Sequence, residues 1–472
     1  MGKKTGFLEF SRSENPLRDV FVRTADFDAL HAPLSANERQ CQAARCMNCG
    51  VPFCQSDFGC PLHNLIPEWN DLLFEGRERE ALFRLLQTAP FPEFTGHVCP
   101  ALCEKACNLE SEGCTNRDNE LYLIETGFAK GWIQPRIPAA RSGKQVAVIG
   151  SGPSGLAAAD LLNQLGHHCT VFERSDRPGG LLMYGIPNMK LPKSVVSRRI
   201  QLLEAEGIRF LLNTEASAED LPSYDAVLLC GGARKPRSLQ VEHMDAQCVC
   251  FAVDYLTAAT RSVLSGLSSS IDAKGKHVVV IGGGDTGNDC VGTTLRQGCL
   301  SVTQLEMMPA PPSARLPGNP WPEWPRILRT DYGQLEAIAL QGADPRIYET
   351  TVQEIVTDAQ NQVTTLITVK LERTADGRFQ PIPGSQRALP CTLLLIAAGF
   401  VGCDERTLSA FSLSADARGR LLPPDGSHHL QGSWFSAGDM RTGQSLVVRA
   451  LADGRAAARE VHHYLCSDHS DS

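Results

Sequence analysis

Short apolar runs alternate with helical patterns along the chain from about residue 144 onward. Apolar runs at residues 145–149 and 276–281 each lead into a glycine-rich turn, a helical pattern and a second apolar run. This order predicts two βαβ units, in which a helix connects two parallel strands. Apolar runs at 225–230 and 392–399 end in small residues and predict further buried parallel strands.

The first 143 residues show a different pattern. Apolar positions within residues 67–87 recur at helical spacing and predict one amphipathic helix, and residues 135–143 have the composition of a linker. The predicted fold class is therefore α/β, with an N-terminal helical domain followed by two Rossmann-like nucleotide-binding domains. The proline-rich segment 309–325 is predicted to be an ordered loop, because Trp321 and Trp324 favour burial.

Composition narrows the class of protein. The chain has 472 residues, which suggests about three domains. Its net charge of −8 argues against a general nucleic-acid binder, which usually shows a basic excess. The sequence has no 18-residue apolar run for a membrane-spanning helix and no apolar signal segment near its start. We therefore expect a cytoplasmic protein without nucleic-acid or membrane partners.

Both glycine-rich turns follow the G-x-G-x-x-G pattern between a strand and a helix. In that context the glycines permit a tight turn, close approach of a pyrophosphate, and close helix–strand packing. The pyrophosphate lies at a helix N-terminus, where free N–H groups favour an anion. An acidic residue about 20 positions further on binds ribose hydroxyl groups. The candidate residues of the first site are Gly150, Gly152, Gly155 and Glu173, and those of the second are Gly282, Gly284, Asp285, Thr286 and Gly287.

Two dinucleotide sites in one chain suggest a flavin and a nicotinamide, with hydride passing between them. The first loop is the better FAD candidate, because a second glycine-rich turn with Gly180 follows it and the late pair Gly438-Asp439 fits the FAD ribityl or phosphate region. The FAD domain is then discontinuous, with the nicotinamide domain inserted in it. The expected ranges are 1–143 for the helical domain, 144–240 and 401–472 for the FAD domain, and 241–400 for the nicotinamide-nucleotide domain.

The sequence leaves the form of the nicotinamide open. Glu306 lies where a ribose-binding acid favours NAD, whereas Arg315 follows soon after and is suited to a 2′-phosphate.

Cysteine is concentrated near the N-terminus, where nine of the 18 cysteines lie within residues 41–114. A dense block in a cytosolic chain indicates metal binding or redox chemistry more often than disulfides. Thiolates favour zinc or iron–sulfur clusters. Beside a flavin and a nicotinamide, iron–sulfur is the more economical interpretation, because a hydride brings two electrons that must leave singly. The two close runs are Cys46, Cys49, Cys54 and Cys60, and then Cys99, Cys103 and Cys107; Cys41 and Cys114 flank the block and are expected to take no part.

Over nearly its whole length the chain resembles the small (beta) subunit of bacterial glutamate synthase. The related electron-entry domain of dihydropyrimidine dehydrogenase has the same plan. The segments that carry the resemblance are RCMNCGVPFC, CPLHNLIPEWNDL, FPEFTGHVCPALCEKAC, GSGPSGLAAA, RPGGLLMYGIPNMKLPK, IGGGDTGNDC, NPWPEWP and AGDMRTGQSLVVRA.

The resemblance implies an NADPH-oxidising FAD subunit with two [4Fe–4S] clusters in its N-terminal domain. It implies three cysteines and one carboxylate or amide as ligands of the second cluster, and Glu125 is similar in context to that fourth position. The implied ligands are Cys46, Cys49, Cys54 and Cys107 for the first cluster, and Cys60, Cys99, Cys103 and Glu125 for the second. The chain departs from the family in longer stretches between Cys54 and Cys60 and between Cys107 and Glu125.

The resemblance further implies a large (alpha) subunit, which uses the electrons to make L-glutamate from L-glutamine and 2-oxoglutarate. One alternative is an NADPH:acceptor oxidoreductase that feeds another partner, such as a pyrimidine reductase or a ferredoxin. Another is a non-catalytic relative that keeps FAD and clusters as structural or redox-sensing groups.

Overall fold

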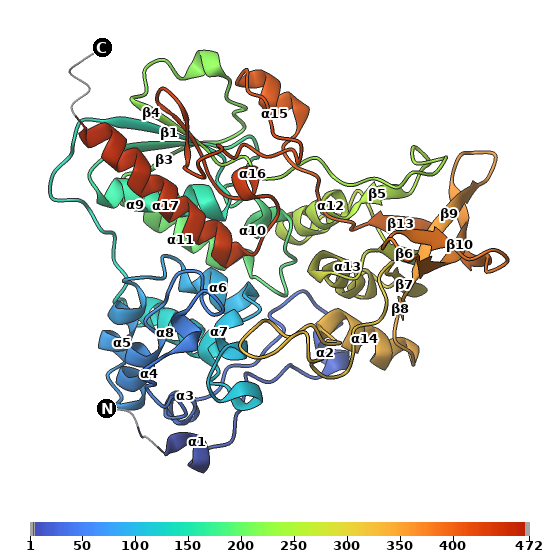
Figure 1. Ribbon diagram of the computed structural model, residues 1–472, viewed down its shortest axis with the longest axis horizontal. Helices are drawn as coiled ribbons and strands as arrows, with labels where there is room; N and C mark the ends of the chain where they lie inside the picture. Colours follow the sequence, from blue (N-terminus) through green and yellow to red (C-terminus); the bar gives the residue numbers. More distant parts are fainter. Residues whose placement is uncertain (1–2, 4, 468–472) are drawn as a thin grey trace.

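The computed structural model describes residue 3 and residues 5–467. A helical domain lies at the lower left of Figure 1, one nucleotide-type domain lies above it, and a second lies to the right. No helix in the described part of the chain is long and apolar enough to cross a membrane.

Short helices build the N-terminal domain around Trp69, Leu82 and Leu123, which are fully buried. The helix predicted over residues 67–87 is two helices, because the chain turns at Gly76, whose φ of +74° suits glycine. The elements are α1 (Gly6–Glu9), α2 (Val20–Arg23), α3 (Ala36–Ala43), η1 (Phe53–Gln55), α4 (Ile66–Phe74), α5 (Glu78–Leu85), α6 (Pro92–Val98), α7 (Leu102–Lys105), η2 (Glu110–Glu112) and α8 (Asn116–Ala129).

A six-stranded sheet forms the second domain, in the order β14-β15-β4-β1-β2-β3. Helices α9, α11 and α17 cover one face, and α17 runs alongside α9 in Figure 1. Strands from both ends of the chain meet here, since β15 pairs in parallel with β4. The strands are β1 (Gln145–Ile149), β2 (His168–Phe172), β3 (Arg209–Leu211), β4 (Ala226–Leu229), β14 (His429–Gln431) and β15 (Trp434–Ser436). The helices are α9 (Pro153–Gln164), α10 (Leu181–Tyr184), α11 (Lys193–Ala205), η3 (Ala218–Asp220), α15 (Glu405–Ala410), α16 (Asp439–Thr442) and α17 (Val447–Cys466).

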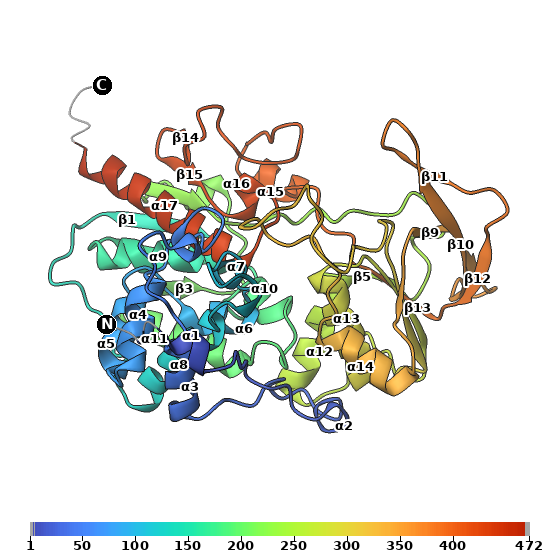
Figure 2. The ribbon, with the colours of Figure 1, turned by 60° about the horizontal axis from the view of Figure 1, so that its bottom comes forward.

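The third domain has a parallel sheet in the order β5-β13-β6-β7-β8, with helices on one face. Its other face packs on a four-stranded antiparallel sheet at the right of Figure 2, which the sequence analysis did not predict. The parallel strands are β5 (Val249–Phe251), β6 (His277–Ile281), β7 (Ser301–Leu305), β8 (Arg346–Ile347) and β13 (Leu393–Ile396), and the helices are α12 (Ala252–Ser265), α13 (Asp285–Arg296) and α14 (Tyr332–Gln341). The antiparallel strands are β9 (Thr350–Thr357), β10 (Val363–Arg373), β11 (Phe379–Pro381) and β12 (Arg387–Pro390).

An N-terminal strap, residues 15–35, ties the three domains together. Arg23 in the strap donates to Glu336 of α14 at 2.7 Å, and the same carboxylate accepts from Arg296 of α13 at 2.6 Å. Leu30 packs with Met189 and Tyr332, one residue from each nucleotide-type domain. The strap therefore fixes the second and third domains relative to the first.

A buried ion pair joins the two nucleotide-type domains directly. The Lys190 ammonium lies 2.9 Å from the carboxylate of Asp289 on α13, and the Tyr332 hydroxyl donates to that carboxylate at 2.9 Å. Asp289 is 4% exposed, so breaking the pair would leave a buried charge without its partner.

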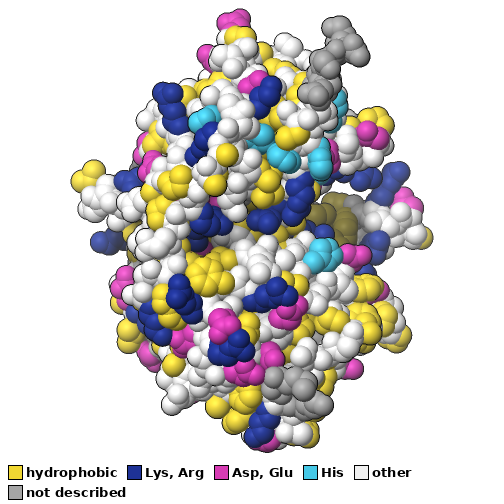
Figure 3. Space-filling model, turned by 90° about the vertical axis from the view of Figure 1, so that its left-hand side faces the viewer, with side chains coloured by type: hydrophobic (Ala, Val, Ile, Leu, Met, Phe, Trp, Pro, Cys, Tyr) yellow, Lys and Arg dark blue, Asp and Glu magenta, His cyan; other side chains and the backbone are white. Residues whose placement is uncertain are grey.

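The surface over the first two domains carries charges of both signs. Figure 3 shows Lys and Arg side chains interspersed with Asp and Glu on this face, with histidines grouped in its upper part. His167 and His462 hydrogen-bond to each other at 2.9 Å between ring nitrogens.

Candidate nucleotide and iron–sulfur sites

The first glycine loop joins β1 to α9, and two of its glycines are required by the protein itself. Gly150 has a φ of +105°, and a Cβ on it would lie 2.5 Å from the carbonyl oxygen of Cys230. A Cβ on Gly155 would lie 2.0 Å from the carbonyl oxygen of Gly150, so helix and strand pack too closely for a side chain.

Gly152 is different, because nothing in the protein demands a glycine there. Its φ of −66° is open to any residue, and a Cβ on it would meet no atom within 4 Å. The empty space lies at the N-terminus of α9, where a pyrophosphate binds in this kind of loop. A dinucleotide therefore fits the first loop.

Glu173 is held at the end of β2 beside this loop. Its buried carboxylate accepts from the backbone N–H of Ser151 at 3.2 Å and from that of Ser175 at 2.8 Å. A Cβ on Gly180 would lie 2.9 Å from Cα of Gly152, so the second glycine-rich turn also touches the loop. A polar recess beyond Glu173 suits the adenosine end of a dinucleotide; its lining includes Arg174, Asn213, Glu215, Arg234, Arg261 and Arg406.

The C-terminal turn reaches the same loop. A Cβ on Gly438 would lie 2.6 Å from Cβ of Ser154, in the first turn of α9. Asp439 accepts from the Ser445 hydroxyl at 2.9 Å, and burial raises the pKa of Asp439 to about 6. The structure thus brings the predicted residues from both halves of the chain to one site.

The second loop, between β6 and α13, repeats this geometry. Gly282 has a φ of +116°, and a Cβ on Gly287 would lie 2.2 Å from the carbonyl oxygen of Gly282. Gly284 has a φ of −81°, and a Cβ on it would meet nothing within 4 Å. Asp285 and Thr286 begin α13 and are exposed at the loop. A second dinucleotide fits here, because the space beside the middle glycine at the helix N-terminus is again free of protein atoms.

Glu306, at the end of β7, contacts this second loop. Its carboxylate accepts from the backbone N–H of Gly283 at 2.7 Å and from that of Met308 at 2.8 Å. That is the position of an acid that binds the adenosine ribose, and its charge repels a 2′-phosphate. Arg315, the candidate for binding such a phosphate, donates to the carbonyl oxygen of Asn319 at 3.3 Å.

We expect Glu306→Gln to raise the ratio of kcat/KM for NADPH to that for NADH by roughly tenfold, because the amide keeps an acceptor for Gly283 and loses the charge. Steady-state kinetics with both nucleotides measure the ratio. An unchanged ratio would show that Glu306 does not lie near the 2′ position.

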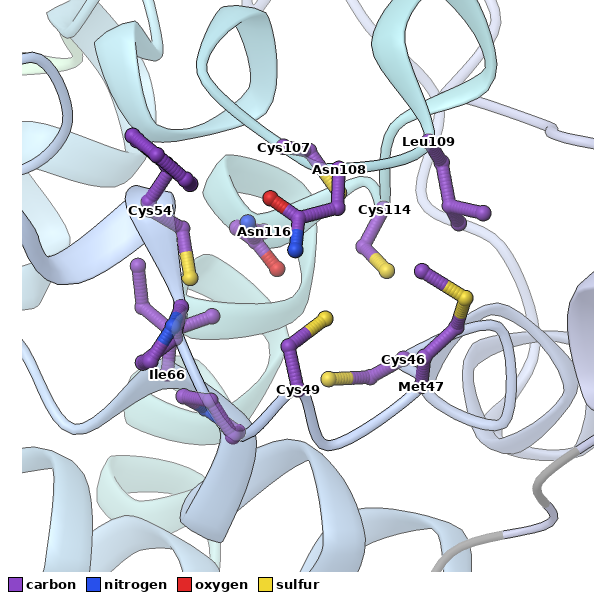
Figure 4. A pocket seen from close by; sticks show the side chains of 13 residues that line it. Cys46, Met47, Cys49, Cys54, Ile66, Cys107, Asn108, Leu109, Cys114 and Asn116 are labelled. Atoms are coloured by element: carbon purple, nitrogen blue, oxygen red, sulfur yellow. The ribbon is translucent and has the colours of Figure 1, made fainter.

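Five thiols converge on a pocket in the helical domain. Figure 4 shows the side chains of the four predicted first-cluster cysteines and of Cys114 around one space. Cys114 was expected to take no part, but it is 2% exposed and lines the pocket with the others. A hydrogen bond from Cys114 lowers the pKa of Cys107 to about 6, and burial raises the pKa of Cys54. The predicted thiols are Cys46, Cys49, Cys54 and Cys107.

A second group contains Cys60, Cys99 and Cys103. Burial raises the pKa of Cys60 to about 11 and that of Cys99 to about 12, and it raises that of Cys103 strongly. The charge of Glu120 raises the pKa of all three thiols further. Burial raises the pKa of Glu120 itself to about 8.

Glu125 has another partner. Its two carboxylate oxygens accept from Arg198 of α11 at 2.6 and 2.9 Å, and the Arg198 guanidinium stacks 3.7 Å from the ring centre of Phe128. Glu125 is therefore paired with α11, while Glu120 on the same helix is the carboxylate whose charge acts on the three cysteines. This differs from the expectation that Glu125 completes the second ligand set, and sequence spacing alone did not single out Glu120.

Two groups of several cysteine thiols fit the ligand chemistry of iron–sulfur clusters. In the described part of the chain, no three His, Cys, Asp or Glu side chains are placed to hold one metal ion. The thiolates of a zinc site bind one atom at about 2.3 Å, whereas those of a [4Fe–4S] cluster each bind a different iron.

Two family models match the chain. The model described as dihydropyrimidine dehydrogenase domain II, 4Fe-4S cluster, matches residues 23–128, and the pyridine nucleotide-disulphide oxidoreductase model matches residues 144–454. The glutamate synthase [NADPH] small chain of Bacillus subtilis is 47% identical over 98% of this chain and 99% of its own length. This chain belongs to the glutamate synthase small-chain family.

Other relatives extend this similarity. The small chain of Mycobacterium tuberculosis H37Rv is 41% identical over 98% of this chain and 96% of its own length. The glutamate synthase [NADH] of Schizosaccharomyces pombe is 45% identical over 98% of this chain, which corresponds to 23% of that protein. Among solved structures, M. tuberculosis FprA in complex with NADPH has a TM-score of 0.52 at 18% identity, covering 68% of this chain and 84% of FprA, and it shares the fold.

Proposed function

We propose that this chain is the electron-entry subunit of a cytoplasmic glutamate synthase. It oxidises NADPH with the help of FAD and two [4Fe–4S] clusters and delivers electrons to a large (alpha) subunit, which makes L-glutamate from L-glutamine and 2-oxoglutarate. The observation that carries the proposal is similarity over the full length to glutamate synthase small chains. The structure adds two dinucleotide-type glycine loops and two groups of cysteine side chains.

The proposed assignments follow the geometry of each site. FAD binds at Gly150, Gly152, Gly155, Glu173, Gly180, Gly438 and Asp439, and the nicotinamide nucleotide binds at Gly282, Gly284, Asp285, Thr286 and Gly287. When bound, the flavin supplies hydride acceptance and the clusters supply one-electron transfer. The chain's own residues bind the pyrophosphates at two helix N-termini. The Lys190–Asp289 ion pair holds the two nucleotide domains in a fixed relative position.

The proposed cluster ligands keep the cysteine assignments and change the fourth ligand of the second cluster. Cys46, Cys49, Cys54 and Cys107 hold the first cluster. Cys60, Cys99 and Cys103 hold the second, with Glu120 in place of Glu125. The burial of Glu120, the effect of its charge on the three thiols and the Glu125–Arg198 ion pair support this change.

The fungal relative supports a large partner. In S. pombe the matching region is 23% of a much longer glutamate synthase chain, so the equivalent of this chain is covalently joined to the rest. The proposed large subunit is then the counterpart of the rest of that fungal chain.

A different acceptor is the second candidate. A putative oxidoreductase of Escherichia coli, AegA, is 34% identical over 96% of this chain and 70% of its own length. The second candidate is an NADPH:acceptor oxidoreductase that feeds another partner, such as a pyrimidine reductase or a ferredoxin. Co-purification of a large subunit, with glutamate formation in the complex, would favour the first candidate.

Anaerobic purification of the chain tests the proposal. We expect about eight iron atoms and eight sulfides per FAD, and bleaching of the flavin absorbance on addition of NADPH. Zinc in place of iron, or a flavin that NADPH does not bleach, would contradict it.

A further inference from the structure

The segment between β7 and α14, residues 306–331, links the second nucleotide site to the first cysteine pocket. It begins at Glu306, whose carboxylate contacts the second glycine loop. In Figure 1 the segment leaves the third domain and extends toward α7 of the helical domain. The part of the chain that follows the second dinucleotide site thus reaches the thiols.

Trp321 makes the contact with the pocket. Its indole N–H donates to the carbonyl oxygen of Cys107 at 3.1 Å. Its ring lies 4.8 Å, centre to centre, from that of Phe53, a lining residue of the pocket next to Cys54. One side chain therefore touches the backbone of one proposed ligand and the neighbour of another.

The segment holds Trp321 in place through its own hydrogen bonds. The buried Asn319 side chain donates to the carbonyl oxygen of Trp324 at 3.0 Å and accepts from the backbone N–H of Arg326 at 2.8 Å. These bonds on both sides of Trp321 fix the segment that carries it, and they use only the backbone of Trp324, which an alanine at that position keeps.

We propose that Trp321 is a positioning residue that covers the first cluster: it holds the Cys107 backbone and keeps water and oxygen from the side of the pocket formed by Phe53 and Cys54. This inference rests on the ligand set proposed above for the first cluster. Hydrogen bonds near the ligands and exposure to solvent set the potential and lability of such clusters. Without the cover, water stabilises the extra negative charge of the reduced cluster, so its potential becomes less negative.

The test uses the full chain, purified anaerobically, with three variants. Trp321→Ala removes both contacts, Trp321→Phe keeps the ring and loses the N–H donor, and Trp324→Ala is the matched control in the same segment. The first cluster accounts for about half of the iron in the chain. After exposure to air, we expect this half to be lost from Trp321→Ala roughly tenfold faster than from the wild type. Trp321→Phe should be intermediate, and Trp324→Ala should match the wild type. A redox titration followed by EPR should show a less negative potential only for the Trp321 variants.

The outcomes separate this inference from the proposed function. A wild type without iron would overturn the ligand set and the inference with it. A wild type that carries iron, with the same rate of iron loss and the same potentials in Trp321→Ala, would overturn the inference alone. Equal effects of Trp321→Ala and Trp324→Ala would also overturn it, because the effect would then belong to the segment as a whole.

Discussion

Glu120→Ala is expected to remove the second cluster, leaving about four of roughly eight iron atoms per FAD. Glu120 is the carboxylate whose charge acts on Cys60, Cys99 and Cys103, and burial raises the pKa of Glu120 to about 8. A bound cluster compensates for the cost of ionising the buried Glu120 carboxyl, because iron stabilises the carboxylate. Without Glu120, one iron loses its protein ligand, and the cluster is expected to be lost during purification.

Glu125→Ala is the matched control, since it lies on the same helix and carries the same charge. We expect it to keep all of its iron and to lose only the ion pair with the partly exposed Arg198, a cost of about 1 kcal/mol or less. Iron and sulfide per FAD decide the question, and the FAD content reports whether each variant is folded. The reverse result, with iron lost from Glu125→Ala alone, would restore Glu125 as the ligand.

Gly284→Val is expected to slow reduction of the flavin by NADPH at least about 100-fold while the content of FAD and iron stays unchanged. The substitution causes no strain, because the φ of Gly284 is −81° and a Cβ there meets no protein atom within 4 Å. The added side chain instead occupies the space of the pyrophosphate. Stopped-flow measurement of flavin bleaching gives the rate, and dithionite should still reduce the flavin.

Gly152→Val is the reciprocal variant in the first loop. Its space is equally free of protein atoms, so we expect a folded chain that keeps its iron and purifies without FAD. Flavin and iron analysis measures both quantities. If Gly152→Val kept FAD, or Gly284→Val lost it, the assignment of the two loops would be exchanged.

Local sequence predicted the features that depend on neighbouring residues. The strand predicted at 145–149 is β1, and the close contacts of Gly155 with Gly150 and of Gly287 with Gly282 lie within single loops of the chain. The family and the order of domain types were predicted from sequence motifs. The similarity to the B. subtilis small chain and the two matching family models confirm both. The predicted domain limits stay predictions.

Features that depend on packing were not predictable in this way. Glu120 and Glu125 are five residues apart on α8 and point about 140° apart around the helix, so only the folded chain shows which faces the thiols. The β9–β12 sheet was missed because its strands are defined by pairing with each other and by packing on the parallel sheet. Cys114 lies outside the close cysteine runs, and only the fold brings it to the first pocket.

The strap of residues 15–35 implies an order in which the domains fold and dock during synthesis. Arg23 is separated by 313 positions from Glu336, so the strap is synthesised long before its partner on α14 exists. All proposed cluster ligands precede residue 121, and domains near the N-terminus fold first during synthesis. The helical domain can therefore acquire its iron while the rest of the chain is still on the ribosome, whereas locking of the three domains is among the last events of biosynthesis.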